Sequence, residues 1–210
     1  MESGAIIQMG AFVLGLVLGS RHCKKAISWR YPIVELLSGL LLWLLVRRVD
    51  DPIVLVPQAV FLLALLAVAW IDLDTRTIPD VVTIPGVGLG LAASLFGPPG
   101  LAGAALGALS GGVSLWLVGA LYEKATGVAG MGGGDVKLAA MMGAFLGVGG
   151  VFGAIFLASL AGSIFGMLLI ARGKGSRRTA IPFGTFLAPA AIALCLYGEP
   201  LFRFYRSFLH

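Results

Sequence analysis

Two aspartates stand at positions where carboxylates could catalyse a reaction. Asp72 directly follows the uncharged stretch 52–71, and Asp135 follows the glycine-rich run 130–134 and precedes another apolar stretch. If the chain crosses a membrane repeatedly, the end of one such stretch and the start of a later one return to the same side. Two adjacent carboxyl groups can share a proton, so that one activates water while the other protonates a carbonyl oxygen. The pair is therefore compatible with hydrolysis of a peptide bond.

Each of these acids also has a simpler interpretation. Asp72 is spaced for an i, i+4 ion pair with Arg76. Asp80 follows Pro79 and Asp135 follows a glycine loop, so both could cap helix N-termini. Paired acids also form ion sites in membrane transporters. The residues alone leave these alternatives open.

The composition predicts a membrane protein. Of 210 residues, 59% are hydrophobic without counting the 31 glycines, and only 12% are charged, about half of the roughly 25% expected of a soluble domain. The net charge of +5 is then typical of cytoplasmic loops, so we expect a lipid bilayer and no nucleic acid as partner. Cys23 and Cys195 are too few for a four-cysteine zinc site, and we expect no metal.

The uncharged stretches predict the crossings. A helix needs about 20 apolar residues to cross a hydrocarbon core about 30 Å thick. This indicates an all-α helix bundle of about eight transmembrane helices: 3–20, 31–46, 52–71, two within 81–122 divided at 97–100, two within 138–171 divided at 147–150, and 179–198. Glycines inside the fourth to seventh spans are expected to let helices pack closely in lipid.

The basic residues orient this bundle. With the N-terminus outside, eleven of the 15 Lys and Arg fall in cytoplasmic loops, and only Arg47, Arg48, Arg203 and Arg206 lie outside. This orientation places Asp72 on the cytoplasmic face together with Asp135.

Two sequence segments around the acids resemble a known family. Residues 72–80, DLDTRTIPD, are similar to the first aspartate motif of the type IV prepilin peptidases, and residues 132–138, GGGDVKL, resemble their second motif, GxGD. Residues 27–37 and 181–184 are also similar to family segments. The resemblance runs along most of the chain.

The resemblance implies a function and a site. Asp72 and Asp135 match the catalytic aspartates of a membrane aspartic protease that cleaves prepilins or type II secretion pseudopilins after a glycine, at the cytoplasmic face of the bacterial inner membrane. Four further residues match the motifs and are expected to support the site or bind substrate: Asp80, Gly132, Gly134 and Lys137. Residues 1–210 would form one peptidase domain, with the first span and its loop in 1–30 and spans two to eight in 31–210.

One departure concerns a second activity. Many relatives carry two CxxC pairs in a longer first cytoplasmic loop, whereas here residues 18–20 run almost directly into Arg21, and only Cys23 stands at a matching position. Proteolysis implies no cofactor, and S-adenosylmethionine is implied only if the family's methylation of the new N-terminus is retained. The oligomeric state and the role of Glu35 stay open.

Two functions from other classes remain as alternatives. A small transporter using paired acids as an ion site would have acids at the membrane midplane and two inverted halves. A noncatalytic scaffold would explain the glycines but not the two aspartate motifs. If the chain is a peptidase, helix polarity assigns the base to Asp135, at a partly positive helix N-terminus, and the shared proton to Asp72, at a partly negative C-terminus.

Overall fold

The computed structural model describes residues 30–127, 131–172 and 182–207. Within these ranges the chain forms helices and short connections, without strands. The helices are α2 (Arg30–Val46), α3 (Pro52–Thr75), α4 (Asp80–Ala93), α5 (Leu101–Thr126), α6 (Gly133–Ala171) and α7 (Gly184–Ser207). The expected all-α class is confirmed, whereas the expected first span, 3–20, lies outside the described residues.

Three helices are long and apolar enough to cross a membrane: α3, α5 and α6. Helices α2, α4 and α7 contribute shorter apolar stretches of 10–17 residues. These helices support a multi-pass membrane protein, but they do not establish the expected count of eight crossings.

The chain divides within α3 into two compact units, one ending at Leu66 and one beginning at Ala67. In the first unit, the guanidinium of Arg47 lies 4.9 Å from the ring centroid of Trp43, next to the end of α2. A cation over an aromatic face is favourable at a helix end near a membrane surface. The second unit carries both acidic motifs.

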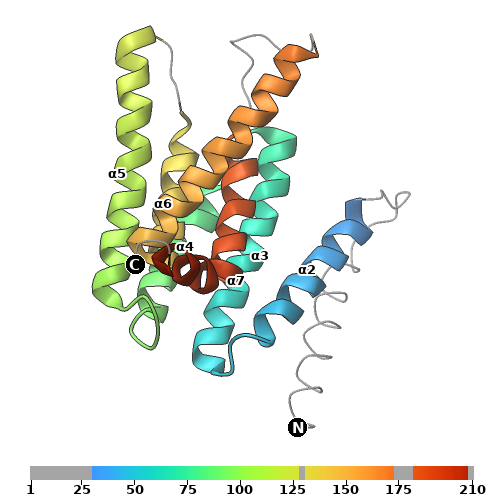
Figure 1. Ribbon diagram of the computed structural model, residues 1–210, viewed down its shortest axis with the longest axis vertical. Helices are drawn as coiled ribbons and strands as arrows, with labels where there is room; N and C mark the ends of the chain where they lie inside the picture. The colour runs from blue at the N-terminus through green and yellow to red at the C-terminus, as the bar shows by residue number, and fades with distance from the viewer. Residues whose placement is uncertain (1–29, 128–130, 173–181, 208–210) are drawn as a thin grey trace. The chain divides into compact units, whose positions relative to one another are not determined.

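Helix α6 is the centre of the second unit, where it packs against α4, α5 and α7. Its backbone breaks at Gly147, whose φ of 69° and ψ of −177° are not helical. Glycine tolerates a positive φ because it has no Cβ. The two arms of α6 on either side of the break run in opposite directions (Figure 1). The sequence predicts a boundary between two spans at 147–150, because glycines interrupt the stretch 138–171, which is too long for one crossing.

The reversal brings both arms of α6 against α5. A Cβ added at Gly111 of α5 would lie 2.6 Å from the carbonyl oxygen of Ala139, in the first arm, and 2.7 Å from Cγ2 of Val151, in the second. A Cβ at Gly107 would overlap the carbonyl oxygen of Gly143. Glycine is therefore required where the backbones touch, as expected for close helix packing in lipid.

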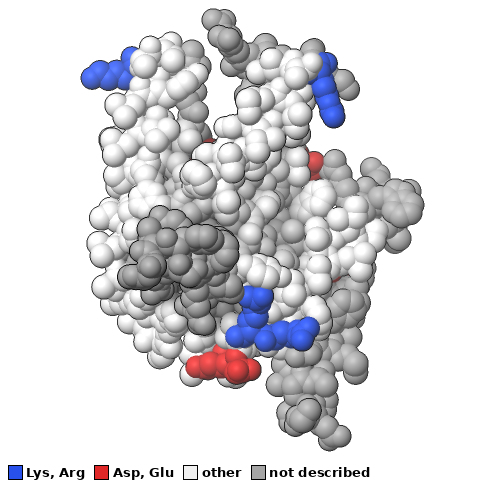
Figure 2. All heavy atoms as spheres, in the orientation of Figure 1, with Lys and Arg blue, Asp and Glu red and all other residues white. Residues whose placement is uncertain are grey.

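The exposed surface of these helices is largely uncharged. Figure 2 shows that over α5 and α6 this face carries mostly uncharged side chains, with basic side chains near helix ends. Exposed apolar residues include Leu106, Trp116, Phe156 and Met167. Such a surface is stable next to lipid but would be an aggregation site in water.

The glycine contacts predict that replacing glycine by alanine destabilises the fold at one position and not at another. We expect Gly143→Ala to lower the free energy of unfolding by about 1–3 kcal/mol, because its Cβ meets the α5 backbone. Gly88→Ala in α4 is the control, since a Cβ there has nothing within 4 Å. Unfolding in mixed detergent micelles measures both, and equal destabilisation would contradict the packing described.

Candidate active site

Asp72 lies in the last turn of α3 and is buried, with 4% of its surface exposed. Its Oδ2 accepts a hydrogen bond of 2.8 Å from the main-chain N–H of Thr185 and one of 3.1 Å from the Thr185 hydroxyl. Both donors come from the start of α7. Two donors on one oxygen satisfy this buried carboxyl group and fix its orientation.

The chain turns sharply after Asp72. Arg76 adopts a left-handed φ of 55°, and its N–H donates a 2.9 Å hydrogen bond to the carbonyl oxygen of Asp72. This bond closes the C-terminal end of α3. Four residues later α4 begins at Asp80, so the loop between the helices is short. The Arg76 ion pair offered as a simpler interpretation of Asp72 does not form, because Thr185 bonds that carboxylate instead.

Asp135 lies in the first turn of α6. The cap of this helix is Gly132, whose carbonyl oxygen accepts a 3.1 Å hydrogen bond from the Asp135 N–H, and no side chain caps the helix. The Oδ1 of Asp135 is buried without a hydrogen-bond partner in the described part of the chain. Asp135 is therefore not the helix cap that its sequence position allowed.

Ile78 contacts residues next to each of the two acids. A Cβ added at Gly134, next to Asp135, would lie 2.8 Å from Cβ of Ile78. A Cβ added at Gly184 would lie 2.9 Å from both Cδ1 of Ile78 and Oδ2 of Asp72. The side chain of Ile78 therefore packs against both glycine backbones.

Lys137 and Asp80 form an ion pair beside the acids. The Nζ of Lys137 in α6 donates to Oδ2 of Asp80 in α4 over 2.6 Å, and these side chains are 43% and 53% exposed. Asp80 does not cap α4, since the cap is Pro79 and has no side-chain hydrogen bond. The pair joins the N-terminal ends of α4 and α6.

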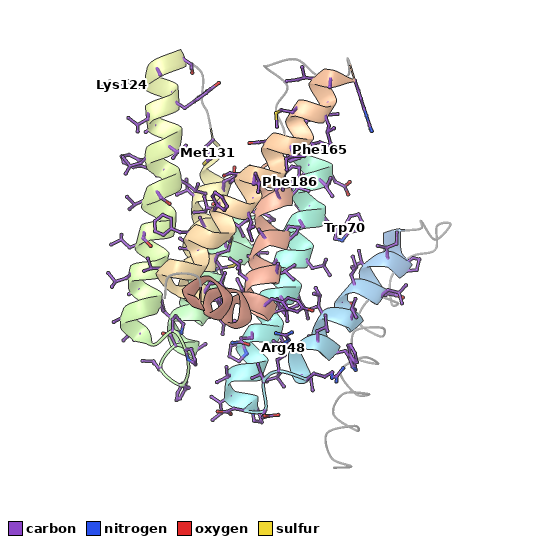
Figure 3. All side chains as sticks on the ribbon, in the orientation of Figure 1. Arg48, Trp70, Lys124, Met131, Phe165 and Phe186 are labelled. Carbon is purple, nitrogen blue, oxygen red and sulfur yellow. The ribbon has the colours of Figure 1, made fainter. Side chains whose placement is uncertain are left out.

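Aromatic packing holds α7 next to the second arm of α6. The rings of Phe165 and Phe186 lie 5.6 Å apart between centroids, and Figure 3 shows these two side chains facing each other. Phe186 directly follows Thr185, so this contact helps to fix the donors to Asp72.

The structure brings the predicted residues to one end of the second unit. Gly134, next to Asp135, lies against Ile78, and Gly184 lies against both Ile78 and Asp72. Gly132 is also close, since its added Cβ would lie 3.3 Å from Oδ2 of Asp135. The sequence does not identify Thr185 as the donor to Asp72 or Ile78 as the contact between the two segments. The available signal is that Thr185 directly follows residues 181–184, which resemble a family segment.

The described residues contain no group of three or more His, Cys, Asp or Glu that could hold a metal ion.

Comparisons with known proteins match most of the chain. The model of the type IV leader peptidase family matches residues 59–167, which include Asp72 and Asp135. The chain belongs to the type IV leader peptidase family. A second model, of the bacterial peptidase A24 N-terminal domain, matches residues 14–49.

Curated relatives support this family assignment. A prepilin leader peptidase/N-methyltransferase of Pseudomonas aeruginosa is 38% identical over 196 residues, covering 92% of this chain and 68% of the relative. The protein of the same name from Xanthomonas campestris is 40% identical over 195 residues, covering 90% and 66%. That from Aeromonas salmonicida is 37% identical over 188 residues, covering 89% and 65%. The chain thus spans about two thirds of the length of these relatives, and no solved structure matches it.

We expect the ion pair between Lys137 and Asp80 to make a small, salt-sensitive contribution to the stability of this leader peptidase family member. Because both side chains are partly exposed, we expect a double-mutant cycle of Asp80→Asn and Lys137→Met to give a coupling energy of about 0.2–1 kcal/mol. Raising the salt concentration should reduce it. Unfolding in detergent at low and high salt measures the coupling, and a salt-independent value would contradict a solvated pair.

Proposed function

We propose that the chain is a membrane-embedded aspartic endopeptidase that removes the leader from type IV prepilins or type II secretion pseudopilins. The meeting of the Asp72 and Asp135 segments at Ile78, from separate helices, carries this proposal. Membership of the type IV leader peptidase family supports it, as do relatives named prepilin leader peptidase. Two carboxyl groups with one proton between them are sufficient to hydrolyse a peptide bond without a metal.

The hydrogen bonds divide the work between the two acids. Two donors from Thr185 hold Oδ2 of Asp72 in place, so we assign to Asp72 the base that takes a proton from the attacking water. Asp135, whose Oδ1 has no hydrogen-bond partner in the described part of the chain, holds the shared proton and donates it to the carbonyl oxygen. Helix polarity alone predicts the opposite assignment.

In this proposal the reaction takes place at the cytoplasmic face of the bacterial inner membrane. The cleaved peptide bond follows a glycine that precedes the apolar segment of the mature substrate. The chain crosses the bilayer eight times, with the N-terminus outside. Basic residues support this orientation, since Arg76 follows α3, Lys124 lies near the end of α5, and Arg172 follows α6, all at ends on the side of the acids.

The supporting roles of the motif residues follow from their positions. The Lys137 and Asp80 pair holds α4 and α6 together beside the acids. Gly134 lets the backbone before Asp135 pack against Ile78, and Gly132 lets it pass close to the Asp135 carboxyl group, so both glycines support the site.

The alternative function, a small transporter, would need acids inside the long apolar stretches. Both acids lie at helix ends instead, so the positions of the acids do not favour a transporter.

Methyl transfer is not part of the proposal. The relatives' name includes N-methyltransferase, which implies S-adenosylmethionine in those proteins. One cavity of about 520 Å³ is lined by Ser159, Gly162, Ser163, Gly166, Met167, Ile170, Phe183 and Phe186. The described residues that line it carry no charge to pair with the cofactor's ammonium and carboxylate groups, so this lining gives no argument for a cofactor site.

The central experiment replaces each acid by its amide. We expect Asp72→Asn and Asp135→Asn each to lower the rate of prepilin cleavage about 100- to 10,000-fold, because neither amide can exchange the proton. Cleavage of a prepilin in liposomes measures the rate. Asp74→Asn is the matched control, since Asp74 is exposed and should leave the rate unchanged. Cleavage that survives either amide would overturn the proposed site.

The Thr185 hydroxyl should have a smaller effect. Thr185→Val keeps the side-chain shape and the main-chain N–H but removes one donor to Asp72, so we expect roughly fivefold slower cleavage. Thr185→Ser retains the hydroxyl and should restore the rate. The pH–rate profile is the second readout, and a valine variant that matches wild type in both measurements would remove Thr185 from the mechanism.

A further inference from the structure

The loop between α3 and α4 places one apolar side chain between the two acid-bearing segments. Ile78 contacts Gly134, the residue before Asp135, and also Gly184, which lies against Asp72. Ile78, Gly134 and Gly184 come from three separate segments and meet at a single side chain.

Ile78 is half-buried, and its side chain is tightly packed at two glycine positions. A Cβ at Gly134 would approach Cβ of Ile78 to 2.8 Å, and a Cβ at Gly184 would approach Cδ1 of Ile78 to 2.9 Å. Carbon atoms in contact are usually about 3.5–4.0 Å apart, so neither position accepts a methyl group without movement. Gly133, between the two motif glycines, has nothing within 4 Å of an added Cβ.

The position of Ile78 is fixed from both sides. Before it, the N–H of Arg76 bonds the carbonyl oxygen of Asp72. After it, the carbonyl oxygen of Pro79 accepts hydrogen bonds from the N–H groups of Val82 and Thr83 in α4. Isoleucine is branched at Cβ and stiff at χ1, so its side chain transmits this position to the glycines it touches.

We propose that Ile78 is a positioning residue that sets the separation of the Asp72 and Asp135 carboxyl groups by filling the space between Gly134 and Gly184. This inference rests on the proposed function. A pair of carboxyl groups works only if a peptide carbonyl and a water molecule fit between them, and a displacement of about 1 Å can cost about 100-fold in rate.

The two ends of the Ile78 side chain make the proposal testable. Ile78→Val removes Cδ1, which meets the Gly184 position, and retains Cβ, which meets the Gly134 position. We expect Gly184→Ala and Gly134→Ala each to slow prepilin cleavage about tenfold or more in liposomes. Adding Ile78→Val should then recover about threefold in the Gly184→Ala background and nothing in the Gly134→Ala background. A merely destabilised fold would not produce this asymmetry.

Single variants complete the design. Ile78→Ala should lower kcat about tenfold with little change in KM, and unfolding in detergent should show that it is still folded. Gly133→Ala is the matched control within the same motif and should cleave at the wild-type rate. Equal recovery in the two double variants, or an unchanged kcat for Ile78→Ala, would overturn the positioning role.

The outcomes separate this inference from the proposed function. If wild type cleaves prepilin and the amide variants do not, while the Ile78 variants behave as wild type, only the inference fails. If wild type fails to cleave, or if either amide variant cleaves, the proposed function fails and the inference falls with it.

Discussion

A buried carboxylate needs donors from the protein, and this requirement organises the second unit. Asp72 is almost fully removed from solvent, so leaving its charge without hydrogen bonds would cost several kcal/mol. The donors come from Thr185, 113 positions later in the chain. The start of α7 must therefore be held against the end of α3, and the packing of α7 on α6 meets this condition. Asp135, in the first turn of α6, is brought to the same site by its neighbour Gly134, which lies against Ile78.

The sequence predicted the parts of this arrangement that depend on local chemistry. Acids are rare in an apolar chain, so Asp72 and Asp135 were conspicuous at the ends of uncharged stretches. Glycine and proline interrupt helices, and the predicted boundaries at 97–100 and 147–150 match the start of α5 at Leu101 and the break at Gly147.

Tertiary contacts decided what the sequence did not predict. Asp80 and Asp135 were both spaced to cap helices, but the caps are Pro79 and Gly132. The side chain of Asp80 instead reaches Lys137, 57 positions away. Local spacing reports which hydrogen bonds are possible, whereas partners from other helices determine which ones form. The sequence does not predict the role proposed for Ile78 for the same reason, since Ile78 contacts Gly134 and Gly184, which are distant in the chain.

The lengths of two helices affect the lipid around the site. Helix α4 has 14 residues, and the first arm of α6, 133–146, is equally long, so each rises roughly 21 Å. Both are shorter than a hydrocarbon core about 30 Å thick, and such hydrophobic mismatch is relieved by thinning the bilayer next to the short helices. Asp80 and Asp135 lie at the N-terminal ends of these two elements. Thinning of the bilayer there lets headgroups and water approach these ends, where a hydrolytic site needs water as its second reactant.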